Sequence, residues 1–272
     1  MKEKNKKLKR EIRFEFGKNW KSFLLKLDNK RIKEAEKSIL EMLEIKSLKN
    51  KSILDIGSGS GLFSLAAHKL GARVHSFDYD ANAVTCTKEL RTRYFPNTKN
   101  WIIEQGSVLD INYLNSLGTF DIVYSWGVLH HTGDLWKSLE NVVPLVNKNG
   151  ILFIAIYNDV GSKRYKFWWG VKKLYCSGII GKYFICSIFI PYRFFKVLIK
   201  SIIENNNIFS RYKENRGMSI THDWIDWYGG FPYEVAKVEE IFHFYNNYGF
   251  SLKNIKTTVG VGCNEYVFIK KI

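Results

Sequence analysis

The stretch KSILDIGSGSGLFSLAAHKLGARVHSFDYD, residues 51–80, decides the fold of this chain. It begins with a short apolar run at 53–56, which is typical of a strand buried on both faces. Three glycines follow, and then a helical pattern that Gly71 ends as a C-terminal stop. A second apolar run ends on Asp78. The pattern predicts strand, glycine turn, helix and strand, with a carboxylate at the tip of the second strand.

The glycines at 57, 59 and 61 mark a turn where a ligand can approach the main chain. Glycine has no side chain to block that approach, and the start of the following helix offers unpaired N–H groups. Asp78 lies about 20 residues beyond the turn, a separation that suits hydrogen bonds to both hydroxyls of a ribose. The alternative is a tight strand–helix turn that binds no ligand.

The spacing Gly57-x-Gly59-x-Gly61 differs from the G-x-G-x-x-G of dinucleotide-binding enzymes. With Asp55 two residues before the first glycine, it resembles the D-x-G-x-G-x-G motif of class I S-adenosylmethionine-dependent methyltransferases. Two further stretches continue the resemblance in the same order, GSVLD at 106–110 and FDIVYSWGVLHH at 120–131. The resemblance extends from about residue 51 to residue 157.

The resemblance implies an α/β fold, a Rossmann-like, doubly wound sheet of seven strands. Most strands are expected to be parallel, the last one antiparallel, with a helical insertion or lid between strands 5 and 6. The alternation of apolar runs with helical patterns agrees with this class. Strands are expected near 51–56, 73–78, 101–105, 120–125, 150–156, 250–257 and 265–270, and helices near 30–45 and 234–248.

A single methyltransferase domain over 1–272 suits a chain of this length. Its expected parts are a basic and aromatic cover at 1–50, a cofactor-binding core at 51–157, an insertion at 158–235, and a last helix with the closing strand pair at 236–272. A hydrophobic content of 46% allows a large core and argues against disorder. The four cysteines form no C-x-x-C pair and the first residues lack the apolar segment of a signal peptide, so we expect a cytoplasmic location, with the inner membrane surface as an alternative.

The formal net charge of +16 is concentrated in two segments. Residues 1–13 carry seven Lys/Arg against two Glu, a net of +5, and residues 160–217 carry twelve against two, a net of +10. Basic segments that flank an active face favour an anionic partner, such as a phosphorylated small molecule, an acidic membrane surface or a nucleic acid. The alternative is that the charge serves solubility alone.

The insertion contains a long apolar run at 179–203. Four Lys/Arg side chains and Pro191 interrupt it, which makes it too broken for a membrane-spanning helix and suits an interfacial one. We expect its Ile, Phe and Tyr side chains to pack on the aromatic N-terminal segment or on a second subunit, as in a homodimer.

The resemblance implies S-adenosylmethionine as the cofactor and S-adenosylhomocysteine as the product. It assigns the methionine part of the cofactor to Asp55 and to the backbone of Gly57, Ser58, Gly59 and Gly61. Trp126 and Gly127 are expected to line the methionine and sulfonium side.

The nucleoside part of the cofactor is assigned to the tips of the second and third strands. Asp78 is expected to bind the ribose hydroxyls, Tyr79 to lie along the adenine, and Ser107 with the N–H of Val108 to contact the adenine amino group. Trp20 is expected to belong to a cover over the cofactor. For Tyr79 and Trp20 the alternative is plain packing.

A hydroxyl acceptor needs a general base for methylation, whereas a phosphate or carboxylate oxygen is already anionic and does not. The candidate bases are His130 and His131 after the fourth strand, and His222 with Asp223 in the insertion. Adjacent histidines in an extended segment cannot both face one pocket, so at most one is expected to be catalytic. The alternative for each is helix capping or a structural hydrogen bond.

The acceptor is expected to contact Tyr157 and Asn158 at the end of the fifth strand, and Arg216 and Trp227 in the stretch that folds back over it. Metal-binding relatives of the quinone type have a carboxylate just before the histidine, where this chain has Val128-Leu129. We therefore expect no metal.

These observations predict an O-methyltransferase for a small, polar, anionic metabolite that is phosphorylated or nucleotide-linked, such as a surface-polysaccharide precursor. No specific nucleic acid partner is expected, because the chain has no Asn-Pro-Pro-Tyr-type base-flipping motif. An RNA methyltransferase is the first alternative. The second is a methyltransferase-like protein in peripheral contact with a membrane, where it acts on or binds a lipid-linked substrate.

Overall fold

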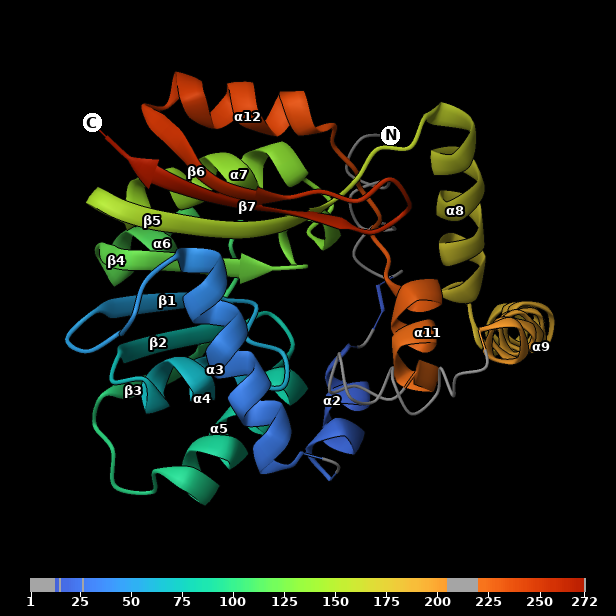
Figure 1. Ribbon diagram of the computed structural model, residues 1–272, viewed down its shortest axis with the longest axis horizontal. Helices are drawn as coiled ribbons and strands as arrows, with labels where there is room; N and C mark the ends of the chain where they lie inside the picture. The colour runs from blue at the N-terminus through green and yellow to red at the C-terminus, as the bar shows by residue number, and fades with distance from the viewer. Residues whose placement is uncertain (1–12, 15, 26, 205–219, 272) are drawn as a thin grey trace.

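The computed structural model describes residues 13–14, 16–25, 27–204 and 220–271. Within them, seven strands form one sheet in the order β3-β2-β1-β4-β5-β7-β6 (Figure 1). The strands are β1 (Ser52–Ile56), β2 (Arg73–Asp78), β3 (Trp101–Gln105), β4 (Phe120–Trp126), β5 (Val146–Tyr157), β6 (Phe250–Lys256) and β7 (Cys263–Lys270). β7 pairs antiparallel with β5 and β6, and the other neighbours are parallel. The seven-stranded Rossmann-like sheet predicted from the sequence is confirmed.

Helices cover both faces of this sheet (Figure 1). On one face lie α3 (Asn29–Leu43), α4 (Leu62–Lys69) and α5 (Ala81–Tyr94), and on the other α6 (Ile111–Leu117), α7 (Leu135–Val142) and α12 (Val238–Asn247). A hydrophobic core lies on each face of the sheet. Successive residues of β1 point to opposite faces, since Ile53 packs in the core under α3, α4 and α5 and Leu54 in the core under α6, α7 and α12. This burial on both faces explains why the neighbouring residues Ile53 and Leu54 are both apolar.

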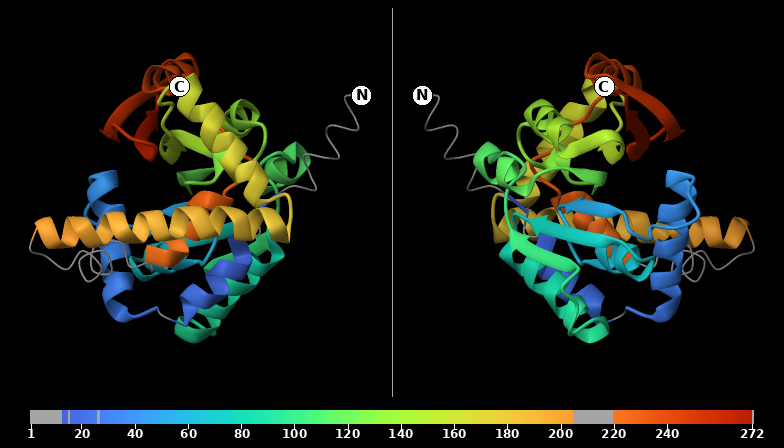
Figure 2. Two further views of the ribbon diagram at one scale, coloured as in Figure 1. Left: turned by 90° about the vertical axis from the view of Figure 1, so that its right-hand side faces the viewer. Right: turned by 90° about the vertical axis from the view of Figure 1, so that its left-hand side faces the viewer.

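A further group of helices lies beyond the carboxyl ends of the parallel strands (Figure 1). It consists of α2 (Phe16–Leu24), α8 (Ser162–Tyr175), α9 (Ile179–Ile203) and α11 (Ile220–Gly229). Figure 2 shows α9 running across this end of the molecule. The helical insertion predicted between strands 5 and 6 is therefore present, as α8, α9 and α11.

The helix predicted over 234–248 is shorter in the structure and begins only at Val238. The residues before it pair with the end of β5, because the N–H of Ala236 donates to the carbonyl oxygen of Tyr157. With this start, Phe242 is exposed.

Candidate active site

The glycine turn joins β1 to α4 at the carboxyl edge of the sheet. Gly57 and Gly59 have φ angles of 78° and 55°, in the left-handed region that favours glycine. A Cβ atom on Gly57 would lie 2.5 Å from the side chain of Val128, so no larger residue fits there. A Cβ on Gly59 would lie 3.2 Å from Nε1 of Trp20. The indole of Trp20 therefore lies against the turn, at the place predicted for the cofactor cover.

Asp78, at the tip of β2, lies beside the glycine turn as the sequence predicts. Its Oδ2 accepts the N–H of Gly59 at 2.9 Å and its Oδ1 accepts the N–H of Asp80 at 2.8 Å. Burial raises the pKa of this carboxyl to about 6, although the backbone N–H donors oppose the shift. A carboxylate has about four lone-pair sites, so Asp78 retains acceptor capacity for ligand hydroxyls.

Asp55 ends a buried chain of hydrogen bonds. Nε1 of Trp101 donates to Oγ of Ser76 at 2.9 Å, the hydroxyls of Ser76 and Ser64 are 2.7 Å apart, and Oγ of Ser64 donates to Oδ2 of Asp55. Burial raises the pKa of Asp55 to about 7, against the lowering effect of the Ser64 bond. In the structure this carboxylate thus holds β1, α4 and β2 together. Its contact with the methionine part of the cofactor stays a prediction.

The residues predicted to bind adenine lie at the same edge of the sheet. Tyr79 is exposed, and the guanidinium of Arg13 lies 4.7 Å from the centre of its ring. Oγ of Ser107 accepts the N–H of Leu109 at 3.2 Å, and Val108 is buried. Trp126 is exposed at the end of β4, and nothing lies within 4 Å of a Cβ built on Gly127. The exposed Trp126 side chain and the open space beside Gly127 lie where the methionine part of the cofactor was predicted.

The N-terminal segment is fixed across this edge by polar contacts. The N–H of Gly17 donates to Oδ2 of Asp80 at 2.8 Å, which ties α2 to the start of α5. A guanidinium N–H of Arg13 donates to the carbonyl oxygen of Thr132 at 2.9 Å. The ring of Phe16 lies 5.1 Å from that of His131. The segment therefore covers both the glycine turn and the histidines.

His130 and His131 lie in a 3₁₀ turn, η1 (Leu129–His131), that follows β4. His130 is completely buried, and its Nδ1 accepts the N–H of Tyr157 at 3.3 Å. Its Nε2 has no hydrogen-bond partner among the described residues. Burial, and then the neighbouring His131 and Lys172, hold the pKa of His130 well below the usual range, so this ring is neutral.

His131 is also neutral but has a different partner. Its Nδ1 lies 2.7 Å from the carbonyl oxygen of Pro232. Because a carbonyl can only accept, Nδ1 carries the proton and Nε2 holds the lone pair. Burial lowers the pKa of His131 to about 3; the Pro232 bond opposes this shift, and the charges of Lys172 and Arg13 add to it.

Sequence reasoning missed Lys172, which α8 buries next to the histidines. Its Nζ donates to the carbonyl oxygen of Trp227 and lies 4.1 Å from the centre of that indole ring. The rings of Tyr233 and Tyr157 follow, at 4.9 Å and 5.6 Å. In the sequence Lys172 looks like its neighbour Lys173, which is exposed. Only the fold distinguishes the two.

Of the residues predicted to contact the acceptor, Tyr157 and Trp227 come together, with ring centres 5.2 Å apart. The amide of Asn158 instead binds the β6–β7 connection, since its Nδ2 donates to the carbonyl oxygens of Thr258 and Gly260. Its contact with the acceptor stays a prediction. Arg216 lies outside the described residues, and so do the side chains of His222 and Asp223, whose backbone belongs to α11.

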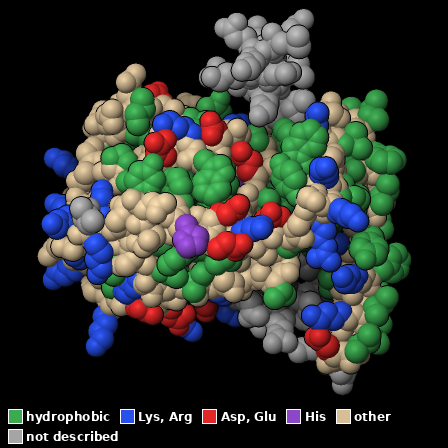
Figure 3. Space-filling model, turned by 90° about the horizontal axis from the view of Figure 1, so that it is seen from above, with side chains coloured by type: hydrophobic (Ala, Val, Ile, Leu, Met, Phe, Trp, Pro, Cys, Tyr) green, Lys and Arg blue, Asp and Glu red, His purple; other side chains and the backbone are tan. Residues whose placement is uncertain are grey.

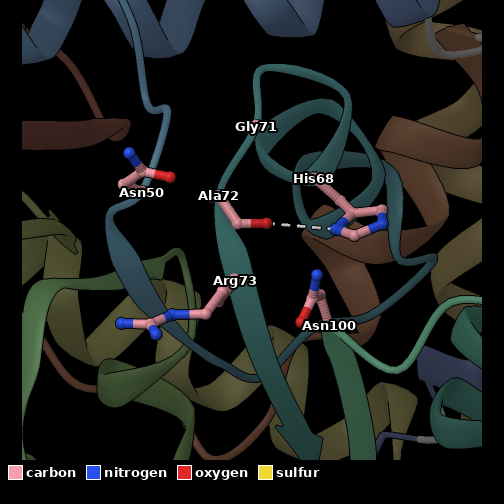
Figure 4. Close-up of a pocket in the computed structure, with 6 residues that line it drawn as sticks. All are labelled: Asn50, His68, Gly71, Ala72, Arg73 and Asn100. Atoms are coloured by element: carbon pink, nitrogen blue, oxygen red, sulfur yellow. Dashed lines mark hydrogen bonds between the residues drawn. The ribbon is translucent and has the colours of Figure 1, made fainter.

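A separate hollow of about 360 Å³ lies at the opposite edge of the sheet, where β2 begins (Figure 4). Nδ1 of His68 donates to the carbonyl oxygen of Ala72 at 3.1 Å there. The other lining residues are Asn50, Gly71, Arg73 and Asn100. Ligands of open α/β sheets bind beyond the carboxyl ends of the strands, so we place the active site at the glycine turn and not in this hollow.

The sequence family described as "Methyltransferase domain" matches residues 27–184. Among curated proteins, the chain is similar to a ubiquinone biosynthesis O-methyltransferase of Pelagibacter ubique, with 30% identity over 47% of this chain and 52% of the relative. It is also similar to a ribosomal protein L11 methyltransferase of Prochlorococcus marinus, with 34% identity over 44% of this chain and 39% of the relative. The chain thus matches about half, or less, of the length of these relatives.

Solved structures share the fold at low sequence identity. Magnesium protoporphyrin IX methyltransferase (ChlM) from Synechocystis PCC 6803, with bound SAH, has a TM-score of 0.52 and 12% identity, over 89% of this chain and 84% of that one. PKMT2 from Rickettsia typhi has a TM-score of 0.57 and 12% identity, over 88% of this chain and 52% of that one. The family match covers more than half of the sequence and agrees with the seven-stranded sheet. This chain therefore belongs to the methyltransferase-domain family, and its fold is that of the class I S-adenosylmethionine-dependent methyltransferases.

Proposed function

We propose that the protein methylates a hydroxyl oxygen of a small, anionic metabolite with S-adenosylmethionine as the donor. The observation that carries the proposal is the Nε2 atom of His131, an unprotonated nitrogen in a neutral ring just after β4. An acceptor hydroxyl must lose a proton during methylation, and a positioned imidazole is the usual group to take it. A phosphate or carboxylate acceptor would have no use for this nitrogen.

The residues at the carboxyl edge fit the cofactor by their chemistry. The glycine turn exposes main chain, and Asp78 is a half-buried carboxylate with spare lone pairs beside it. When bound, S-adenosylmethionine supplies a methyl group on a positively charged sulfonium. Asp78 would accept the ribose hydroxyls, the turn from Gly57 to Gly61 would hold the methionine part, and Trp20 would exclude water from above the turn.

Two positive charges near His131 support an anionic acceptor. The charges of Lys172 and Arg13 lower the pKa of His131, and the same field favours the alkoxide that forms as the acceptor hydroxyl loses its proton. Among the aromatic rings around Lys172, Tyr157 lies closest to the histidines, with its ring centre 3.9 Å from that of His130. We assign the acceptor to the space bounded by these groups.

The names of the relatives give two kinds of acceptor, an oxygen atom in ubiquinone biosynthesis and a ribosomal protein. The positive charges of Lys172 and Arg13 near His131 favour the oxygen, because they repel a protonated amine. The comparisons name no polysaccharide, so the surface-polysaccharide precursor stays a prediction from the sequence.

The test is methyl transfer from isotopically labelled S-adenosylmethionine to a panel of phosphorylated hydroxyl compounds, carboxylates and amines. Mild alkali distinguishes the products, because methyl ethers survive and methyl esters hydrolyse. Alkali-stable label on a hydroxyl compound supports the proposal. Turnover only of carboxylates, or only of amines, would contradict it.

A further inference from the structure

The outer face of α9 is a continuous apolar stripe. Its members are Ile180, Phe184, Ile188, Phe195, Leu198 and Ile202, which recur every three or four residues or after whole turns, and so share one side of the helix. All six are exposed, from 38% for Leu198 to 83% for Ile180. The helix has 25 residues, so the stripe follows an element about 37 Å long at 1.5 Å per residue.

The protein itself uses the inner face of α9. Ile185 is buried, and Phe189 contacts the rings of Trp168 and Tyr228 at 5.9 Å and 5.4 Å. The guanidinium of Arg193 lies over Tyr228 at 5.4 Å. The described part of the N-terminal segment leaves this outer face exposed, so packing of these residues on a second subunit, the other expectation, stays a prediction. A monomer seldom exposes an apolar patch of this size without a binding partner for it.

Tyrosines border the stripe, and cations lie on the other side of the helix. Tyr183 and Tyr192, both exposed, lie at the two edges of the stripe. Lys182, Lys196 and Lys200 are exposed on the basic flank, the side turned away from the stripe, since their spacing is close to whole turns. Figure 3 shows Lys and Arg side chains beside a hydrophobic outer rim at this side of the molecule. An apolar centre, tyrosine edges and a basic flank are the features of a helix that lies in a membrane interface.

Charge decides between a membrane and a second copy of the chain. From residue 160 to residue 203 the sequence has nine Lys/Arg and no Asp or Glu. A second copy would bring another insertion with the same net positive charge close to this one, and like charges oppose association. An anionic lipid surface has the opposite sign. A helix is about 10–12 Å thick, and the Debye length at 0.1 M salt is about 10 Å. The lysines of α9 therefore still attract an anionic surface that touches the outer face of the helix.

We propose that the outer face of α9 docks the protein on an anionic lipid surface, with the helix parallel to the bilayer plane. Of the helices that the structure describes, none is both long and apolar enough to cross a membrane. The apolar stripe enters the headgroup region, and the basic flank attracts anionic headgroups. The docking is independent of which acceptor the enzyme methylates.

The test is co-sedimentation of the full chain with phosphatidylcholine vesicles that contain or lack phosphatidylglycerol. Binding should be at least about tenfold stronger with phosphatidylglycerol and should weaken between about 0.1 M and about 1 M salt. The double change Phe184→Ser and Phe195→Ser should weaken binding to anionic vesicles by about tenfold or more, because both rings lose their contact with lipid. Lys182→Gln with Lys196→Gln should weaken binding to the anionic vesicles and reduce its salt dependence.

Matched controls have the same changes elsewhere. Ile102→Ser with Val259→Ser alters two exposed apolar side chains outside α9. Lys88→Gln with Lys99→Gln alters two exposed lysines outside the insertion. Both control proteins should bind vesicles as the unchanged chain does. Absence of binding to anionic vesicles, or equal binding by the Phe184/Phe195 variant, would overturn the proposal. So would a dimer in analytical ultracentrifugation that this variant dissociates, since a second copy would then cover the outer face.

Discussion

The carbonyl oxygen of Pro232 accepts a hydrogen bond from Nδ1 of His131 at 2.7 Å. The bond fixes the tautomer of the ring, and Nε2 is left as its basic nitrogen. Residues 131 and 232 are brought together by the segment that returns from α11 to the end of β5. The insertion therefore orients the candidate base in addition to covering the site.

Replacement of this base should reduce turnover. In His131→Asn the side-chain amide can still donate to Pro232, but no nitrogen is left to take a proton. We expect kcat to fall by about 10²–10⁴ with a hydroxyl acceptor, while the affinity for S-adenosylhomocysteine changes little. Steady-state kinetics and calorimetry measure the two quantities. His243→Asn, on the exposed side of α12, is the matched control, and unchanged kcat in His131→Asn would exclude this residue as the base.

The pH dependence should separate the cofactor site from the base. The pKa of Asp78 is raised to about 6, so below that pH the carboxyl becomes protonated and binds ribose hydroxyls less well. The kcat/KM for S-adenosylmethionine should therefore fall as the pH drops below about 6, by up to about tenfold per pH unit. The pKa of His131 is lowered to about 3, so kcat should show no acidic decline near 6.5. An acidic decline of kcat at an ordinary histidine pKa would contradict the neutral base.

Lys172 should hold the pKa of His131 down. Burial is the main cause of the lowered pKa of His131 and remains in Lys172→Met, but the buried positive charge disappears, so this pKa should rise above about 3 and stay below the ordinary value of about 6.5. An acidic decline of kcat should then appear above pH 3 and be absent from the unchanged enzyme. Lys173→Met, one residue away and exposed, should leave the profile as it was. Identical profiles for the two variants would show that the Lys172 charge does not act on the base.

Asp55 should make folding stability depend on pH. Burial raises its pKa in the folded protein to about 7, above an unfolded value of about 3.9, so the folded state binds the proton more tightly. This contribution to the free energy of unfolding therefore grows as the pH falls from 8 to 5, by roughly 2–3 kcal/mol. Asp55→Asn lacks it and keeps an acceptor for Ser64. Denaturant unfolding of both proteins at the two pH values measures the difference, and parallel changes would contradict the raised pKa.

Local patterns made much of the fold predictable from the sequence. The strand and helix periods and the glycine turn depend on neighbouring residues, and they located β1, α4, β2 and Asp78 correctly. Contacts between segments that are distant in the sequence could not be predicted from such local patterns. Pro232 beside His131 and Lys172 beneath Trp227 depend on how the insertion folds back, and nothing in the sequence distinguishes these residues from their neighbours.

The most direct test of the account is calorimetric binding of S-adenosylhomocysteine to Asp78→Asn. The amide keeps an acceptor for the N–H of Gly59, but it loses the second oxygen, which accepts the N–H of Asp80, and the charge that strengthens bonds to the ribose hydroxyls. We expect the unchanged chain to bind and the variant to bind about 1.5–3 kcal/mol more weakly. Asp134→Asn, the same change at the exposed N-cap of α7, should bind as the unchanged chain does. Equal affinity of Asp78→Asn and the unchanged chain, with both proteins folded, would contradict the placement of the cofactor at the glycine turn.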